Sequence, residues 1–216
     1  MAGAEIAEIL DKCSETAEKW KQSAAGIKEA IEKNLWKEEF KRFIRSVRVK
    51  LNPWGSEYSN NTTLIEVNPK GYKRDVTLED WTVDISLLGV SIPFGVYEAG
   101  DSKVENTVNL IELTLSNRNS GGIRRYENDN YAGGNPWILT TLWVALYYIQ
   151  RCEYNKAREY FNWSVKGRTQ LGLLPEQVGK DDGRPAWVIP LTWSHAMFVL
   201  VLFGLIEAGG IVNGEE

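Results

Sequence analysis

Apolar residues recur at helical spacing along most of this chain, and this periodicity limits its fold more than any other feature. The first pattern runs from Ile6 through Trp20 to Ile31 and predicts one long helix, or two helices with a break near Gly26. Further helical patterns occupy residues 36–44, 77–88, 102–115, 137–150, 155–167 and 190–209. Strands do not alternate with helices, and no short repeat is present. The sequence therefore predicts an all-α fold.

Local signals mark where several of these helices begin. Residues 77–80 (TLED) and 102–105 (SKVE) have the spacing of a capping box, and Asn135 before Pro136 has the form of an N-cap followed by proline. The exception to the helical pattern is the segment 47–73, where Asn, Pro, Gly and Ser are frequent and apolar residues alternate with polar ones. We expect a short pair of strands or an irregular excursion there.

The overall composition argues against several classes of protein. A net charge of −4, with no basic stripe, gives no electrostatic basis for binding nucleic acid. The longest apolar stretch, Ala196 to Ile206, is too short to span a bilayer. The N-terminal residues lack the features of a secretion signal, and the spacing of Cys13 and Cys152 favours reduced thiols. We therefore expect a cytoplasmic chain that forms one domain, or a large part of one, and binds neither membrane nor nucleic acid.

The sequence predicts no metal or cofactor site. His195 is the only histidine, and the two cysteines are not clustered. A Ser194–His195 pair is not expected to act as a catalytic dyad, because neighbouring residues on a helix point in different directions. We expect His195 to be a buried residue that is hydrogen-bonded to a loop carbonyl.

Two loops of unusual composition carry the residues that are equipped for chemistry. They are GGIRRYENDNYAGGNPW at 121–137 and GLLPEQ at 172–177, the second followed by PLTWSHA at 190–196. Because short and long connections alternate along the chain, we expect helix hairpins whose long loops gather at one end. Aromatic rings stack on the C–H faces of sugars, while Arg, Asn and Asp bind hydroxyl groups. These loops therefore indicate a carbohydrate pocket.

Each candidate residue also has a purely structural interpretation. Glu176 is either a general base that activates water for attack on an anomeric carbon, or a surface glutamate in a turn. Arg125 either donates to sugar hydroxyls or makes an internal ion pair in a loop with several acidic residues. Of Trp137, Trp187 and Trp193, which lie at or beside these loops, we expect only one or two to face a ligand.

The blocks GGIRRYENDNYAGGNPWILTTLW, LLPEQ and PLTWSHAMF, in this order and spacing, give the chain a resemblance to the glucoamylase family of glycoside hydrolases. This is family fifteen, which includes glucoamylases, glucodextranases and related archaeal trehalases. The resemblance covers essentially the whole chain and is loosest at 48–73. It implies about the C-terminal half of a six-fold α/α toroid. It also implies inverting hydrolysis of α-glucosidic bonds from the non-reducing end of an α-glucan or α-glucosyl disaccharide.

The resemblance also implies roles for individual residues. Glu176 matches the general base of the family's LPEQ motif, Arg125 matches an arginine that contacts sugar, and Trp193 matches a tryptophan that lines the pocket for the terminal glucose. The remaining substrate-binding candidates, all from the same blocks, are Tyr126, Trp137 and Gln177.

The sequence departs from the family at the general acid. In the family this residue lies in a tryptophan-and-double-glutamate motif, upstream of a helix that resembles residues 2–9 here (AGAEIAEI). The segment WKEE at 36–39 lies in the wrong place to replace it. We therefore expect chain 1–216 to be a partial toroid that carries the base without the acid and is inactive alone. Apolar stripes would then need a separate N-terminal-half chain or self-association. These stripes include Ile6, Ile9, Leu10 and Trp20. The alternatives are a non-catalytic carbohydrate-binding remnant and a helical interaction protein.

Overall fold

The structure is a computed structural model that describes residues 2–10, 14–47, 50–51, 62–66 and 69–209. Cys13 and part of the predicted excursion at 47–73 lie outside the described residues. The chain divides into two compact units, Met1–Asp80 and Trp81–Glu216. Both the residues of the two loop motifs and the last three long helices belong to the second unit.

Two helices open the first unit, α1 (Ala2–Leu10) and α2 (Ser14–Leu35). They pack against each other through small residues, which allow the helices to approach closely. The residues buried in this contact are Ala4, Ala7 and Ala17. The first apolar pattern therefore forms two helices, but the break is not near Gly26, which lies inside α2. Outside this contact Ile6, Ile9 and Trp20 are exposed, as expected for the apolar stripe.

The predicted helix at 36–44 is wrong. Strand β1 (Trp36–Lys37), the short 3-10 helix η1 (Glu38–Phe40) and strand β2 (Arg42–Phe43) form a tight hairpin there. The rings of Trp36 and Phe43 face each other across the hairpin, with centroids 4.9 Å apart. This cross-strand aromatic pair, together with the left-handed backbone of Lys41 (φ 49°), outweighs the local helical spacing.

A small antiparallel sheet occupies the predicted excursion. Strands β3 (Lys50–Leu51), β4 (Thr62–Glu66) and β5 (Lys73–Thr77) pair in the order β3-β5-β4. Val76 of the central strand is fully buried, so this residue contributes to the apolar core. The prediction of strands in this segment is confirmed, and the third strand extends beyond it.

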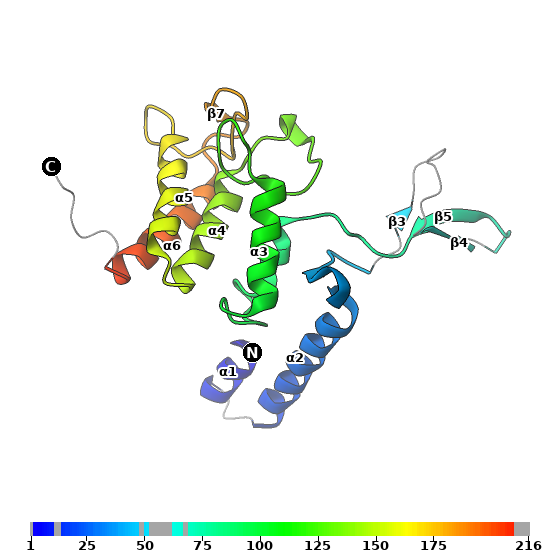
Figure 1. The fold of residues 1–216 in the computed structure, drawn as a ribbon. Helices are drawn as coiled ribbons and strands as arrows, with labels where there is room; N and C mark the ends of the chain where they lie inside the picture. The colour runs from blue at the N-terminus through cyan, green and yellow to red at the C-terminus, as the bar shows by residue number, and fades with distance from the viewer. Residues whose placement is uncertain (1, 11–13, 48–49, 52–61, 67–68, 210–216) are drawn as a thin grey trace. The chain divides into compact units, whose positions relative to one another are not determined.

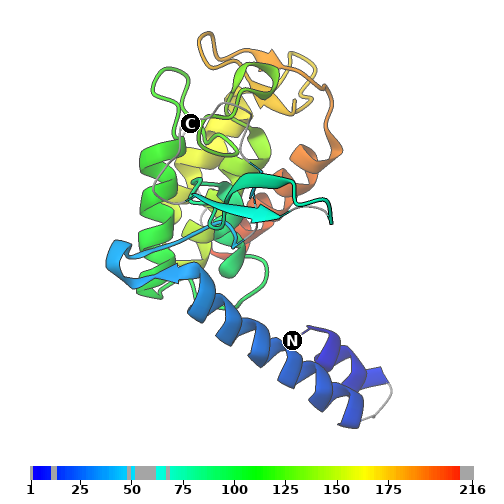
Figure 2. The same ribbon diagram turned by 90° about the vertical axis from the view of Figure 1, so that its right-hand side faces the viewer.

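Three helices pack side by side in the second unit: α4 (Ile138–Gln150), α5 (Tyr154–Lys166) and α6 (Thr192–Glu207) (Figure 1). Helix α4 contacts both of the others, which explains why it is apolar on nearly all sides. Helix α3 (Ser102–Leu115) packs with the 3-10 helix η2 (Ile85–Val90). Figures 1 and 2 place the long loops before α4 and before α6 at the same end of these helices.

Two helix-start signals differ from their predicted form. No helix begins at residues 77–80, because Thr77 ends β5; the next helical turn, η2, begins after Asp84, whose carboxylate accepts a backbone N–H at 2.8 Å. Helix α3 does begin at residues 102–105, but Asp101 is its N-cap and accepts a backbone N–H at 2.8 Å. In both cases an aspartate just before the helix satisfies a free N–H group.

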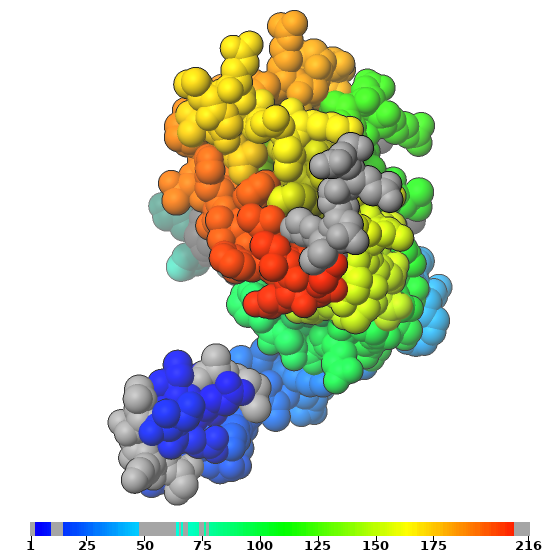
Figure 3. Space-filling view, turned by 90° about the vertical axis from the view of Figure 1, so that its left-hand side faces the viewer, coloured from blue at the N-terminus to red at the C-terminus, as the bar shows by residue number. Residues whose placement is uncertain are grey.

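Helix α6 is apolar on its exposed face as well as on its buried face. Met197, Val201 and Leu205 are buried. The exposed apolar residues of the helix are Trp193, Val199, Leu200, Phe203 and Ile206. In Figure 3 the orange and red atoms of this helix form part of the molecular surface. A helix that is apolar all round is typical of one that is covered on both sides.

Candidate functional site

The two motif-bearing loops meet through a line of backbone pairings. Isolated bridges join Ser116 to Ile123, Ile123 to Trp137, and Trp137 to Gln177. Gln177 belongs to strand β6 (Gln177–Val178), which pairs with β7 (Pro185–Ala186). The segments 121–137 and 172–191, here called the loop cluster, therefore lie together at one end of α4 and α6.

Helix α5 holds the first of these loops by a close contact. The indole N–H of Trp163 donates to the carbonyl of Ser120 at 2.6 Å. A Cβ on Gly122 would lie 2.2 Å from this indole, and Gly122 has φ +75°. Both the ring contact and the backbone conformation require glycine at this position. The adjacent Arg124 donates to the carbonyl of Thr114 at 2.7 Å, so this member of the arginine pair anchors the loop to α3.

Arg125 lies at the centre of an aromatic group. Its guanidinium carbon lies 5.2 Å from the ring centroid of Tyr126, 4.7 Å from that of Tyr131 and 4.4 Å from that of Trp137. Its Nε and Nη2 donate to the two carboxylate oxygens of Asp129 at 2.8 and 2.9 Å. The internal ion pair is thus present, yet the Nη1 group has no hydrogen-bond partner among the described residues. The two interpretations of Arg125 are compatible in this geometry.

The ion pair stabilises the charged forms of both residues. The hydrogen bond to Asp129 is the main reason that the pKa of Arg125 is raised, and the charge of Glu176 adds to it. Burial opposes ionisation of Asp129, but hydrogen bonds from Arg125 and from the backbone N–H of Tyr131 hold its pKa below the ordinary value. Arg125 lies over the ring of Trp137, whose backbone pairs with Gln177, so Glu176 belongs to the same cluster.

Glu176 is not a surface residue of a turn. It is 9% exposed, and its backbone N–H donates to the carbonyl of Val188 at 2.8 Å. Its carbonyl accepts the N–H of Ile138 at 3.2 Å, at the start of α4. The carboxylate accepts a hydrogen bond from Nε2 of Gln177 at 3.1 Å. The Glu176 carboxylate is thus shielded from bulk solvent and held in place by the Gln177 amide.

His195 holds the segment that precedes Glu176. Its Nε2 accepts the backbone N–H of Leu174 at 3.2 Å, so Nδ1 carries the proton and donates to the carbonyl of Leu191 at 2.9 Å. The neighbouring Ser194 donates to the carbonyl of Pro175 at 2.8 Å. The expected hydrogen bond of His195 to a loop carbonyl is confirmed, but the residue is half-buried rather than buried. His195 and Ser194 together fix the LPEQ segment to the start of α6.

The predicted N-cap role of Asn135 is wrong, because Trp137 occupies the N-cap position of α4. The Asn135 side chain instead donates to Oε1 of Gln177 at 3.1 Å and accepts the backbone N–H of Lys180 at 3.1 Å. Gln177 is fully buried between Asn135 and Glu176. Because Gln177 has no exposed surface, its amide contacts Glu176 and is not accessible to a ligand.

The predicted tryptophans occupy different environments. Trp137 is 6% exposed, and among the described residues its indole N–H has no hydrogen-bond partner. Trp193 lies in the first turn of α6 with 60% of its surface exposed, and makes no ring contact with the Arg125 group in the part of the chain described. Glu176, Gln177, Arg125, Tyr126 and Trp137 are therefore brought together, whereas the Trp193 ring stands apart.

Tyr131 and Trp187 form an aromatic pair to which the sequence assigned no specific role, although Trp187 is one of the three tryptophans considered beside the loops. The indole N–H of Trp187 donates to the hydroxyl of Tyr131 at 2.7 Å, and their ring centroids lie 5.7 Å apart. Both rings are exposed, at 42% and 58% for Tyr131 and Trp187. Trp187 has φ +66°, an unusual backbone conformation for a tryptophan. The density of aromatic residues in the loops was the available sequence signal for this pair.

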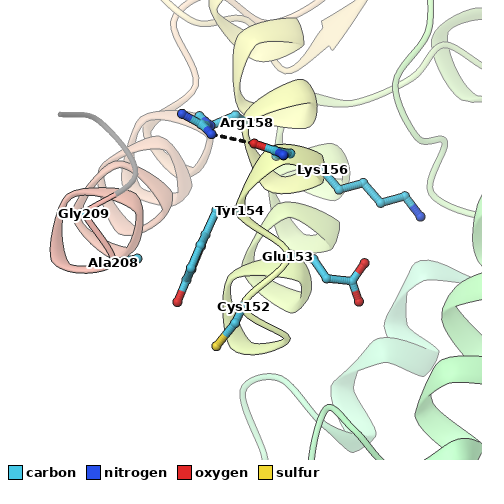
Figure 4. Close-up of a pocket in the computed structure, with 8 residues that line it drawn as sticks. Cys152, Glu153, Tyr154, Lys156, Arg158, Ala208 and Gly209 are labelled. Atoms are coloured by element: carbon cyan, nitrogen blue, oxygen red, sulfur yellow. Dashed lines mark hydrogen bonds between the residues drawn. The ribbon is translucent and has the colours of Figure 1, made fainter. Parts of the chain in front are cut away.

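A separate hollow of about 620 Å³ lies at the turn between α4 and α5 (Figure 4). Residues 152–156, Arg158 and the end of α6 line it, and Cys152 is an exposed free thiol there. None of the predicted site residues borders this hollow. Within the ranges described, no group of His, Cys, Asp and Glu is arranged to bind a metal, and no helix is long and apolar enough to cross a membrane.

The family model and the related proteins that match this chain are all glycosyl hydrolases. The family model for the glycosyl hydrolases of family 15 matches residues 1–203. An uncharacterized glycosyl hydrolase of Methanocaldococcus jannaschii is 37% identical over 145 residues, which are 61% of this chain and 23% of that protein. Isomaltose glucohydrolase of Kribbella flavida is 28% identical over 55% of this chain and 33% of its own length. Trehalase 2 of Sulfolobus acidocaldarius is 29% identical over 58% of this chain and 22% of its own length.

Solved structures agree on the fold. A bacterial glucoamylase complexed with acarbose matches with a TM-score of 0.72 and 26% identity, over 95% of this chain and 31% of that chain. A structure described as a wild-type glycosidase matches with a TM-score of 0.62 over 89% of this chain and 44% of that chain; at 20% identity it supports the fold alone. The predicted all-α fold, part of the α/α toroid of glucoamylases, is confirmed. The chain spans only 22% to 33% of the length of the curated relatives described above.

Proposed function

This chain belongs to the glycosyl hydrolases of family 15, and from that premise we propose that it carries the water-activating part of an α-glucoside hydrolase site. The observation that carries the proposal is the buried Glu176 carboxylate, held by Gln177, whose backbone pairs with Trp137 of the aromatic group around Arg125. In this role Glu176 takes a proton from water as the water attacks the anomeric carbon, which inverts the configuration at that carbon.

The groups around Glu176 suit a sugar. Asp129 uses only two of the five N–H donors of Arg125, so the Nη1 group remains to donate to hydroxyls. The exposed rings of Tyr131 and Trp187 offer flat faces for the C–H surface of a glucose ring. Trp193, at the start of α6, would contribute from the adjoining segment. Direct contact by Tyr126 and Trp137 is part of the same proposal.

An α-glucan or an α-glucosyl disaccharide is the proposed substrate. Two of the relatives are named for isomaltose and trehalose, and the solved glucoamylase is complexed with acarbose. Isomaltose and trehalose both contain α-linked glucose, so the shared feature is an α-glucosyl unit. The particular linkage depends on groups that surround the leaving sugar.

Hydrolysis also requires a general acid to protonate the leaving group. Both carboxylate oxygens of Asp129 are paired with Arg125, and Glu127 accepts the backbone N–H of Val83 at 3.3 Å. We therefore propose that the acid comes from another polypeptide segment, which is either covalently connected or a separate chain, and that residues 1–216 alone do not turn over substrate. The second candidate is carbohydrate binding without catalysis, which the Arg125 aromatic group favours because it is complete without an acid.

Hydrolysis and binding measurements on this chain test the proposal. Incubation with maltose, isomaltose and trehalose should release negligible glucose, whereas nuclear magnetic resonance titration with acarbose should perturb the loop cluster. Robust hydrolysis that Glu176→Gln abolishes would contradict the external acid but retain Glu176 as base. Robust hydrolysis that Glu176→Gln leaves intact would overturn the assignment of the base. If acarbose caused no spectral changes in the loop cluster, the proposed carbohydrate site would be contradicted.

A further inference from the structure

Asn135 lies at the far end of a hydrogen-bond chain that leads to Glu176. We propose that Asn135 is a positioning residue: it fixes the orientation of the Gln177 amide and, through that amide, the donor that faces Glu176. The inference rests on the proposed function in one respect only, namely that Glu176 is the base. The orientation itself is a property of this chain and can be measured without substrate.

Two backbone groups determine which end of the Asn135 side chain is oxygen and which is nitrogen. A backbone N–H can only donate, and a backbone carbonyl can only accept. The N–H of Lys180 lies 3.1 Å from Oδ1 of Asn135, and the carbonyl of Ala132 lies 3.0 Å from its Nδ2. Reversing the amide would place two donors together and two acceptors together. The Asn135 amide therefore has one favourable orientation.

This orientation passes on to Gln177. Nδ2 of Asn135 also donates to Oε1 of Gln177 at 3.1 Å. Since one end of the Gln177 amide is thereby fixed as the acceptor, its Nε2 must face Oε2 of Glu176, which it does at 3.1 Å. Gln177 is 0% exposed, so both bonds are shielded from bulk solvent. In a buried polar network each member constrains the next.

The result is a donor directed at a carboxylate that has little contact with solvent. Other charged or ionisable groups around Glu176 do not replace this donor. Arg125 attracts the carboxylate by its charge, but among the described residues its hydrogen bonds go to Asp129 and none goes to Glu176. Both ring nitrogens of His195 are occupied by backbone groups. Without Asn135, the Gln177 amide would be able to turn its oxygen toward the Glu176 carboxylate.

The substitution Asn135→Asp tests this relay by reversing its polarity. A carboxylate at position 135 still accepts the Lys180 N–H, but it repels Oε1 of Gln177 and favours the flipped amide. The matched control is Asn130→Asp, which adds the same charge in the same loop at an exposed residue without a side-chain hydrogen bond to η3. Asn135→Ala removes the relay without adding charge. Nuclear magnetic resonance spectra of the whole chain would follow the side-chain N–H resonances of Gln177, with and without Glu176→Gln.

In the parent chain, the side-chain N–H resonances of Gln177 should shift on Glu176→Gln, because that substitution removes the charged acceptor of the Gln177 amide. Asn135→Asp should abolish this response, because the flipped amide no longer directs its donor at residue 176, whereas Asn130→Asp should preserve it. Asn135→Ala should weaken the response without adding charge. An equal response in folded Asn135→Asp and Asn130→Asp, or no response in the parent chain, would overturn the proposal. The readout does not depend on hydrolysis, so failure of the proposed function would be seen separately.

Discussion

Arg125 donates to both carboxylate oxygens of Asp129, at 2.8 and 2.9 Å. This ion pair holds the guanidinium in contact with the surrounding aromatic rings. The side chain of Asp129 is fully buried, whereas that of Arg125 is 29% exposed. The Asp129 carboxylate is therefore closed to solvent, and part of the Arg125 side chain is accessible. It orders the guanidinium while leaving its Nη1 donors available within the loop cluster.

Replacing Asp129 by asparagine should destabilise the second unit. The change leaves Arg125 without its charged partner, and we expect a loss of about 2 kcal/mol, since hydrogen bonds to charged groups contribute about 1.5–3 kcal/mol. Because the pKa of Asp129 is lowered by folding, its contribution is present above the unfolded pKa near 4 and is lost as the pH falls through the lowered value. Urea unfolding at pH 7 and at pH 3 measures both effects.

The exposed Asp181 supplies the control for this substitution. Asp181→Asn should leave the unfolding free energy unchanged within about 0.5 kcal/mol, as is usual for surface substitutions. A loss of stability in Asp129→Asn no greater than in this control would show that the ion pair contributes nothing to folding.

Glycine 122 should be far less tolerant of alanine than Gly172. Both have φ near +80°, at +75° and +80°, but only Gly122 has a ring within contact of an added Cβ, Trp163 at 2.2 Å. The shared backbone strain should cost about 1–2 kcal/mol in each variant. The collision should roughly double the cost in Gly122→Ala, because overpacking adds about 1–3 kcal/mol. Thermal unfolding of the two variants measures the difference, and equal costs would show that Trp163 moves away freely.

Alkaline pH should destabilise the second unit through Tyr147. Burial raises the pKa of Tyr147 to about 12, so its contribution to stability is complete below the unfolded pKa near 10 and is lost as the pH rises toward 12. A shift of this size corresponds to about 2–3 kcal/mol. Tyr147→Phe should remove this part of the loss between pH 10 and 12, measured by urea unfolding. Tyr72→Phe, at an exposed tyrosine, is the control and should leave the profile unchanged.

The exposed apolar face of α6 should make the chain associate. Leu200 and Phe203 are 56% and 58% exposed, and soluble monomers rarely leave a large continuous apolar surface uncovered. Light scattering should detect association of the parent chain at micromolar concentration, and Leu200→Glu with Phe203→Glu should reduce it. Leu171→Glu, at an 86% exposed loop residue, is the control. A monodisperse parent that binds no hydrophobic dye would contradict the expectation.

The sequence by itself determined the order of most helices in the second unit and supplied the candidate residues of the site. Helical spacing predicted α3 to α6. The resemblance of the motif blocks to the family implied roles for Glu176 and Arg125 that composition alone left open. The two loops were expected at one end because long and short connections alternate. These are local properties of the chain, so a linear pattern records them.

Only the tertiary structure decided the contacts between residues that are distant in sequence. Asn135 has the local form of an N-cap, yet it bonds to Gln177, 42 residues later. The helical spacing at 36–44 gave way to the Trp36–Phe43 hairpin, since pairing across a turn depends on packing that the spacing does not record. The Tyr131–Trp187 pair joins rings 56 residues apart. Such contacts form because folding brings the loops together, and neither loop specifies its partner alone.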